Sequence, residues 1–180
     1  VDSIRFSGEI WQQVAAGEGS LAAVRELTHY LTRPGWNGPL YFLALEPWLR
    51  LCGRSELVLR LPSALAGVVA VALLYVLGTR LLGRPVGALA ALLAAVNPYL
   101  IWYAGEGKMY ALVTALALLS TWLLLDALRS RDGWRWAGYV LVTSLLFYTH
   151  ILTPLLLPVQ AGLALTLHSR ALRRPAVWLA

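Results

Sequence analysis

From residue 61 onward, long apolar runs alternate with short breaks that contain arginine. The runs cover residues 61–82, 86–103, 109–128, 134–149 and 152–167. An α-helix crosses the hydrocarbon core of a bilayer with about 20 residues, and its backbone hydrogen bonds are satisfied within the segment. The alternation therefore predicts an all-α integral membrane protein with five transmembrane helices in residues 61–180. The last two runs are short, and they become long enough if they extend through residues 148–152.

Composition supports a membrane protein and narrows the function classes. Hydrophobic residues make up 59% of the chain and charged residues 13%, whereas soluble domains average about 45–50% and about 25%. The single cysteine, Cys52, excludes a disulfide within this chain and offers no metal-ligand spacing. The net charge is +6, but the arginines stand at the ends of apolar runs and form no basic tract. We therefore expect no nucleic-acid partner.

The distribution of arginine predicts the orientation in the membrane. The breaks after the first, third and fifth runs contain Arg80, Arg84, Arg129, Arg131, Arg135, Arg170, Arg173 and Arg174. The alternate breaks contain Lys108 and no arginine. Because cytoplasmic loops of membrane proteins are enriched in Lys and Arg, the arginine breaks should be cytoplasmic. Residues 1–60, 97–112 and 148–153 should then face outward.

Residues 1–60 are predicted to form a long outer loop of interfacial helices, without a full span. Apolar residues recur at helical spacing in 21–31, which predicts an amphipathic helix, and prolines and glycines break it at 33–39. Residues 40–51 start a second helix with aromatic residues suited to a membrane interface. A loop of this length is more often functional than a plain linker. The chain begins without methionine and ends in an apolar stretch, so we expect an N-terminal fragment of a longer protein.

The outer break between the second and third runs places an acid and a base two residues apart, at Glu106 and Lys108. One interpretation is a solvated loop whose charges mark the membrane interface. The other uses position: a helix starting near Gly107 has free backbone N–H groups that, with Lys108, form an anion site. Glu106 could then accept a proton, bind a metal or orient a hydroxyl. An anion held at membrane depth would be a lipid phosphate.

Further candidates lie on the same predicted outer face. Glu9 and Asp2 belong to the first outer loop, and Glu9 precedes a short apolar patch at residues 10–11 that would favour a base. Asn37, between Trp and Gly-Pro, fits a turn residue more readily than a ligand. His150 fits either a packing residue or a site residue. No triad spacing, phosphate-binding glycine loop or Cys/His cluster is present in the sequence.

Four stretches together resemble one known family. WYAGEGKMYAL at 102–112 resembles the outer-loop motif of polytopic glycosyltransferases that use polyprenyl-phosphate sugars. These are the family-39-like, PMT-type bacterial membrane proteins, related to protein O-mannosyltransferases and the aminoarabinose transferases of lipid A. Residues 37–67, 78–103 and 146–160, the last reading LFYTHILTPLLLPVQ, resemble further motifs in the same order. The resemblance covers nearly the whole chain from about residue 36.

The resemblance implies a GT-C-like transmembrane helix bundle with its active site at the outer face, in a bacterial inner membrane. A sugar would move from an undecaprenyl- or dolichyl-phosphate carrier to a hydroxyl of a lipid, glycan or protein acceptor. The first-loop acid, Glu9 or Asp2, would act as general base or metal ligand, which leaves a divalent metal ion as the one candidate cofactor. Glu106 would support the site and Lys108 would hold the carrier phosphate.

The resemblance also implies that Tyr110 lines the site and that His150 lies near it. Two positions depart from the family pattern: Gly8 stands where an acid usually precedes Glu9, and Asn37 replaces the usual histidine. One alternative is therefore a degenerate transferase that binds the carrier without reacting.

Another alternative is a non-catalytic lipid-binding protein or a transporter subunit, which predicts polar residues along a path through the bilayer midplane. The first three runs contain few such residues, mainly Thr114, Ser120 and Thr121. This scarcity favours a site at the outer surface over a conduit.

Overall fold

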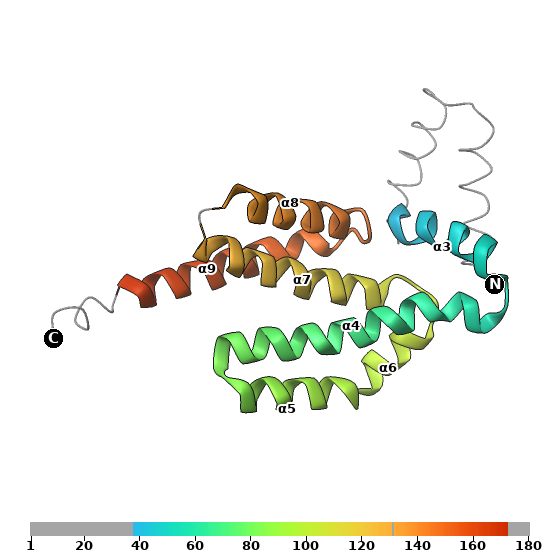
Figure 1. The fold of residues 1–180 in the computed structure, drawn as a ribbon, viewed down its shortest axis with the longest axis horizontal. Helices are drawn as coiled ribbons and strands as arrows, with labels where there is room; N and C mark the ends of the chain where they lie inside the picture. The colour runs from blue at the N-terminus through green and yellow to red at the C-terminus, as the bar shows by residue number, and fades with distance from the viewer. Residues whose placement is uncertain (1–37, 131, 173–180) are drawn as a thin grey trace, which may run out of the picture.

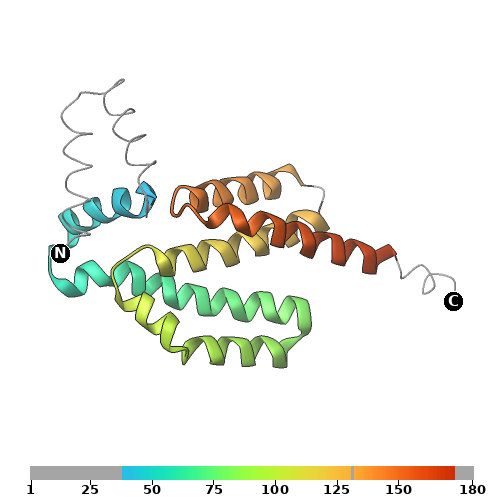
Figure 2. The same ribbon diagram turned by 180° about the vertical axis from the view of Figure 1, so that it is seen from behind.

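The computed structural model describes residues 38–130 and 132–172, and all regular elements within them are helices (Figures 1 and 2). The prediction of an all-α membrane protein is confirmed. The elements in chain order are α3 (Pro39–Cys52), α4 (Glu56–Leu82), α5 (Arg84–Ala95), α6 (Pro98–Gly105), α7 (Tyr110–Arg129), α8 (Gly133–Phe147), the 3-10 turn η1 (Thr153–Leu155) and α9 (Leu156–Leu172). The predicted helix at 21–31 lies outside the described residues.

Two helices are long and apolar enough to cross a membrane on their own, α4 with 27 residues and α7 with 20. They match the first and third predicted runs. The second run becomes a pair, α5 and α6, bent by 57° at a short break. Asn97 causes the break, because its side chain accepts the Tyr99 and Leu100 N–H groups at 2.9 and 3.2 Å. Pro98 then starts α6, where its missing N–H costs nothing.

The fourth and fifth predicted runs correspond to shorter helices. α8 has 15 residues, and the apolar part of the last helix covers Thr153–Leu167. Neither extends through residues 148–152, because the chain turns there and the Thr153 N–H donates to the His150 carbonyl at 3.2 Å. Pro154 and Pro158 fall in the first turns of η1 and α9. By length and composition two or three spans qualify among the described residues, and the five-span topology stays a prediction.

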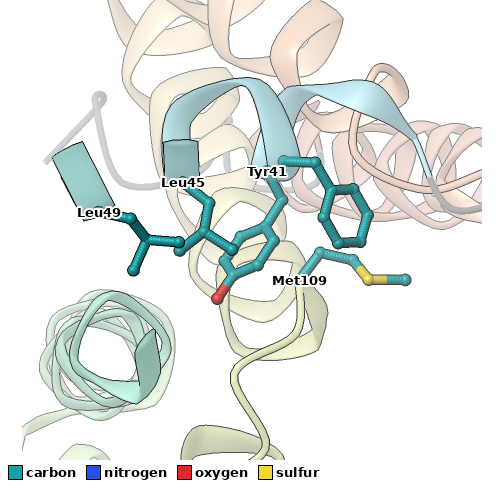
Figure 3. Packing of buried hydrophobic residues seen from close by; sticks show 5 residues of the cluster. Tyr41, Leu45, Leu49 and Met109 are labelled. Carbon is teal, nitrogen blue, oxygen red and sulfur yellow. The ribbon is translucent and has the colours of Figure 1, made fainter. Parts of the chain in front are cut away.

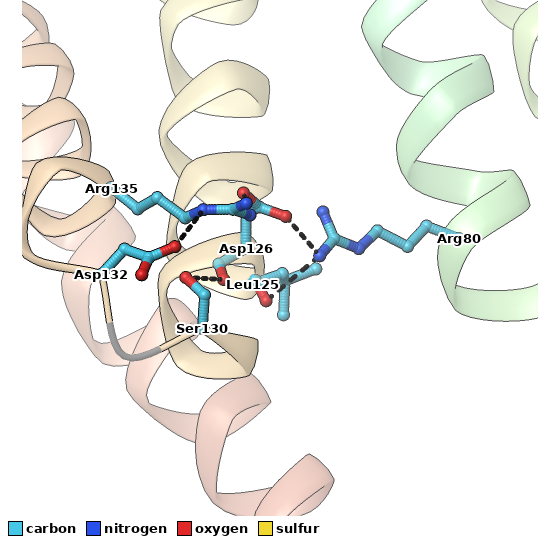
Figure 4. Close-up of polar contacts among 6 residues, drawn as sticks. All are labelled: Arg80, Leu125, Asp126, Ser130, Asp132 and Arg135. Atoms are coloured by element: carbon cyan, nitrogen blue, oxygen red, sulfur yellow. Dashed lines mark hydrogen bonds and ion pairs between the residues drawn. The ribbon is translucent and has the colours of Figure 1, made fainter.

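The connections gather at two ends of the bundle (Figures 1 and 2). The arginine end contains the α4–α5 and α7–α8 connections and the end of α9; the α3 end contains α3, the α6–α7 loop and the α8–η1 turn. At the arginine end, Asp126 of α7 binds Arg80 of α4 at 2.9 Å and also Arg135 of α8 (Figure 4). Two separate arginine breaks therefore meet at one carboxylate. This agrees with the prediction that these breaks share one side.

The apolar face of helix α3 packs on the end of the α6–α7 loop and the start of α7. Tyr41, Phe42, Leu45 and Leu49 are buried with Met109, which follows the α6–α7 loop and is fully buried (Figure 3). This confirms the predicted helix at 40–51 and gives it a packing role. Burial of a large apolar side chain contributes about 1.5–3 kcal/mol, so the five together hold α3 firmly on the start of α7.

The beginning of α3 pairs with the α8–η1 turn through its backbone. The Gly38 N–H donates to the Thr149 carbonyl at 2.9 Å, and the Leu40 N–H donates to the Tyr148 carbonyl at 3.2 Å. A Cβ atom on Gly38 would lie 2.1 Å from the Tyr148 oxygen. Only glycine allows this approach. Helix α3 therefore contacts both the α8–η1 turn and, through Met109, the end of the α6–α7 loop.

Candidate functional site

The α6–α7 loop carries an accessible ion pair. Lys108 Nζ lies 2.7 Å from Glu106 Oε1, and the two side chains are 42% and 27% exposed. Both groups therefore reach solvent while remaining bound to each other. An exposed pair of this kind contributes only about 0–1 kcal/mol to stability, so its placement calls for an explanation other than folding.

Helix α4 holds the backbone of this loop on both sides of the ion pair. Arg60 Nη1 donates to the Gly105 carbonyl at 2.9 Å, and Ser63 Oγ donates to the Lys108 carbonyl at 2.8 Å. Between them, Gly107 has a φ of +65°, a left-handed conformation that favours glycine. The loop is thus held at two points, and the two charged side chains project from the backbone between and at them.

The start of α7 adds a positive end to the same place. Its N-cap position is Met109, and no side chain caps this helix start. The first backbone N–H groups of a helix have no partner within the helix and carry the positive end of its dipole. Together with the Lys108 ammonium they suit a phosphate or another anion, which agrees with the second interpretation of this loop.

Three aromatic rings extend the site from the loop to the α8–η1 turn. The Tyr110 ring centroid lies 4.8 Å from that of Tyr103 and 6.2 Å from that of His150. His150 Nδ1 accepts the Leu152 N–H at 3.2 Å, so a neutral His150 carries its proton on Nε2. The structure brings Tyr110 and His150 together although 40 residues separate them in the chain.

An apolar cavity of about 590 Å³ opens beside the loop, between α4, α5, α6 and α7. Its volume lies within the range of ligand pockets, about 300–1,000 Å³. Gly105, which precedes the ion pair, contributes to its wall, and the Thr114 hydroxyl in the wall is bound to the Tyr110 carbonyl. The remaining lining is almost entirely apolar, and it comprises Ala64, Gly67, Val68, Ala70, Val71, Ala72, Ala94, Ala95, Leu100, Ile101, Tyr103, Ala104 and Ala111.

The structure gathers four of the predicted site residues, Glu106, Lys108, Tyr110 and His150, at the α3 end. Their roles in binding and catalysis stay predictions. Asp2, Glu9 and Asn37 lie outside the described residues, so their place relative to the ion pair stays a prediction as well. Within residues 38–130 and 132–172, no group of three or more His, Cys, Asp or Glu side chains could hold a metal ion.

Three residues that shape the site were not predicted from the sequence as site residues: Arg60, Ser63 and Tyr41. Ser63 is fully buried in α4 and also contacts the Tyr41 hydroxyl at 2.7 Å. A signal was present in the sequence, since Ser63 is a polar residue inside an apolar run, and such residues are usually paired or functional. No sequence signal pointed to Tyr41 as its partner.

Comparison with known proteins gives one family match. The family described as dolichyl-phosphate-mannose-protein mannosyltransferase matches residues 34–180. No curated protein and no solved structure matches the chain. The matched residues include the ion-pair loop, the apolar cavity and the His150 turn.

Proposed function

The chain belongs to the dolichyl-phosphate-mannose-protein mannosyltransferase family, and from that premise we propose that it transfers a sugar from a polyprenyl-phosphate carrier to an acceptor hydroxyl. Family membership makes it a membrane glycosyltransferase of the mannosyltransferase type. The observation that carries the more specific proposal is the Glu106–Lys108 pair, which lies at a helix start next to an apolar cavity.

Lys108 is proposed to bind the carrier phosphate. An ammonium group has three N–H donors, so it can serve Glu106 and a phosphate oxygen at once. The start of α7 contributes backbone N–H groups and its dipole to the same anion. Glu106, 2.7 Å away, would keep the Lys108 ammonium at this position. Tyr110 and His150 would line the side toward the sugar.

The cavity is proposed to take the first part of the isoprenoid chain. Its wall is apolar, and it passes Gly105 beside the ion pair. A polyprenyl phosphate is an anion attached to a long apolar chain, so it needs these two environments next to each other. A free sugar phosphate would need only the anion site, and an ordinary apolar ligand would need only the apolar cavity.

The proposed reaction is an inverting displacement. The acceptor hydroxyl oxygen attacks the anomeric carbon, the bond from that carbon to the phosphate oxygen breaks, and the phosphate leaves on its carrier. A first-loop carboxylate, Glu9 or Asp2, takes the hydroxyl proton. Lys108 and the helix start stabilise the negative charge that returns to the phosphate.

The proposed orientation places this site at the outer face of a membrane, in bacteria the inner membrane. Arg80 and Arg135 meet at the arginine end, opposite the ion-pair loop. Because arginine-rich loops are retained on the cytoplasmic side, the α3 end would face outward. A carrier in the outer leaflet could then reach the cavity between α4 and α6 from the side.

The test is an assay of the full-length protein in membranes with a panel of radiolabelled polyprenyl-phosphate sugars. A hydrogen bond to a charged group contributes about 1.5–3 kcal/mol. For half-exposed Lys108, Lys108→Ala should therefore raise the donor KM about tenfold. Arg129→Ala, which removes an exposed cation at the other end of α7, should leave the donor KM unchanged. Unchanged turnover of Lys108→Ala at limiting donor would refute the proposed role.

Glu9→Gln tests the proposed base in the same assay. Turnover should fall while the donor KM stays close to that of the wild type, because the base acts on the acceptor. A protein that binds carrier but transfers no sugar from any member of the panel would instead be the degenerate transferase.

The transporter alternative gains no support from the polar residues inside the bundle. Gln160 of α9 donates to Ser120 at 3.0 Å and accepts from Tyr139 at 2.9 Å, and Ser120 contacts Thr143 at 2.8 Å. Gln160 and Ser120 are at most 2% exposed. These groups hydrogen-bond to one another across α7, α8 and α9, which is how polar residues join helices in membranes.

A further inference from the structure

Two buried hydroxyl groups connect α3 to the backbone of Lys108. The Tyr41 hydroxyl lies 2.7 Å from Ser63 Oγ, and Ser63 Oγ lies 2.8 Å from the Lys108 carbonyl oxygen. Ser63 is 0% exposed and Tyr41 4% exposed. The three groups belong to α3, α4 and the α6–α7 loop, and Ser63 lies 22 residues from Tyr41 and 45 residues from Lys108 in the sequence.

The direction of both hydrogen bonds follows from the chemistry of the groups. A carbonyl oxygen can only accept, so the one hydroxyl hydrogen of Ser63 points to Lys108. Ser63 then has no hydrogen left for Tyr41, and Tyr41 must donate to Ser63 Oγ. Each bond polarises the next in a low-dielectric interior. The result is a one-way chain that ends on the residue carrying the ammonium group.

We propose that Tyr41 and Ser63 are positioning residues, which fix the Lys108 backbone so that its ammonium group faces the carrier phosphate. This inference rests on the proposed function of Lys108. Buried Met109 and the Arg60 contact to Gly105 hold the neighbouring backbone, but the Lys108 carbonyl is bound by Ser63.

The same contacts make α3 the element that joins the α8–η1 turn to the proposed anion site. One end of α3 pairs with the Tyr148 and Thr149 carbonyls, and its Tyr41 hydroxyl reaches the Lys108 chain. A shift of α3 therefore moves the Lys108 loop and the His150 turn together.

The experiment measures binding of radiolabelled polyprenyl phosphate, and separately of polyprenol, to the full-length protein in phosphatidylcholine nanodiscs. Ser63→Ala and Tyr41→Phe should each weaken polyprenyl-phosphate binding about three- to tenfold, as expected for one hydrogen bond. Binding of polyprenol should not change, because it has no phosphate. The double variant should be no weaker than Ser63→Ala alone.

Two matched variants control for the loss of a buried hydroxyl. Ser120 is also 0% exposed and lies in the spanning helix α7, and Tyr139 also donates its hydroxyl to a partner on another helix. Ser120→Ala and Tyr139→Phe should leave the affinities for both lipids unchanged. Tyr41→Phe retains the ring that packs on Met109, so it should fold even if Ser63→Ala does not.

Three results would overturn the inference: no change in phosphate binding for Tyr41→Phe, equal losses for both lipids, or equal losses in the matched controls. Lys108→Ala separates this failure from that of the proposed function. If Lys108→Ala binds polyprenyl phosphate as the wild type does, the proposed function fails. If it binds more weakly and Tyr41→Phe does not, only the positioning role fails.

Discussion

The two ends of the bundle use charged residues in opposite ways. At the arginine end, Asp126 binds Arg80 and Arg135, and these three side chains are 15–29% exposed. At the α3 end, Lys108 binds Glu106, and Lys108 is 42% exposed. The first group joins three helices through side chains. The second belongs to one loop, and the helices around it are joined to that loop through its backbone.

The surroundings reinforce this difference. Arg80 lies 5.7 Å from the Trp122 ring and Arg135 lies 5.2 Å from the Trp134 ring, so aromatic faces cover the cations at the arginine end. Beside the ion-pair loop, an apolar cavity opens instead. The charges at the arginine end are thus enclosed by partners from several helices, whereas the loop of Glu106 and Lys108 is held through its backbone beside a cavity.

The largest effect is expected from Gly38→Ala, which disrupts the contact that joins α3 to the His150 turn. A Cβ atom would lie 2.1 Å from the Tyr148 oxygen, so the backbone pairing must break or shift. Overpacking of this kind costs about 1–3 kcal/mol. The rate of glycosyl transfer should fall to a small fraction of the wild-type rate. Gly133→Ala, with nothing within 4 Å of the added atom, is the control. Equal activity of the two variants would contradict the role given to α3.

Asp126→Asn should be next in size, and it acts on stability. Arg80 and Arg135 would lose their shared counter-charge in a largely enclosed place, which is costly. The melting temperature in detergent should fall by several degrees while the affinity for polyprenyl phosphate stays unchanged. Asp132→Asn serves as the control, because Asp132 is 54% exposed and 3.4 Å from Arg135. If Asp126→Asn weakened carrier binding without lowering the melting temperature, the structural role given to the arginine end would be wrong.

The same acid-to-amide change at the α3 end, Glu106→Gln, should have a smaller effect of another kind. The amide oxygen can still accept the Lys108 hydrogen bond, but the negative charge next to the proposed phosphate site is removed. Polyprenyl phosphate should bind about two- to fivefold more tightly, since one exposed charge interaction is worth about 0.2–1 kcal/mol. The melting temperature should not move. Weaker binding, measured in the same nanodiscs, would show that the carboxylate acts in some other way.

The smallest effect concerns Tyr41 at alkaline pH. Burial raises the pKa of the Tyr41 phenol above its ordinary value. The unfolded chain therefore ionises first, and stability that is fully present below pH of about 10 is lost as the pH rises beyond it. Between pH 9 and about 11 the wild type should lose more stability than Tyr41→Phe. Parallel melting curves for the two would contradict this.

Much of the bundle could be predicted from the order of residues alone. Apolar runs in 61–82 and 109–128 became α4 and α7 because each is long enough to cross a bilayer as a helix. The grouping of the arginine breaks agrees with Arg80 and Arg135 meeting at Asp126. The last two runs were harder, because a turn at 148–152 depends on hydrogen bonds that hydropathy does not register.

The candidate site was predictable in part for a related reason. Glu106 and Lys108 are two residues apart, so any backbone that turns there can bring them together. Ser63 and Lys108 are 45 residues apart, and Tyr41 and Ser63 are 22 apart. No local pattern links such pairs, and the hydroxyl groups acquire partners only when three separate helical segments have packed.

The sequence by itself determined the class of protein, because the bilayer leaves an apolar chain few ways to satisfy its backbone. It also determined the acid–base pair and the arginine breaks, since both depend on neighbours in the chain. Only the tertiary structure decided that α3 rests on Met109, that Gly38 touches the Tyr148 carbonyl, and that a cavity lies beside the ion pair. These features depend on distances between side chains from different helices, and packing alone sets those distances.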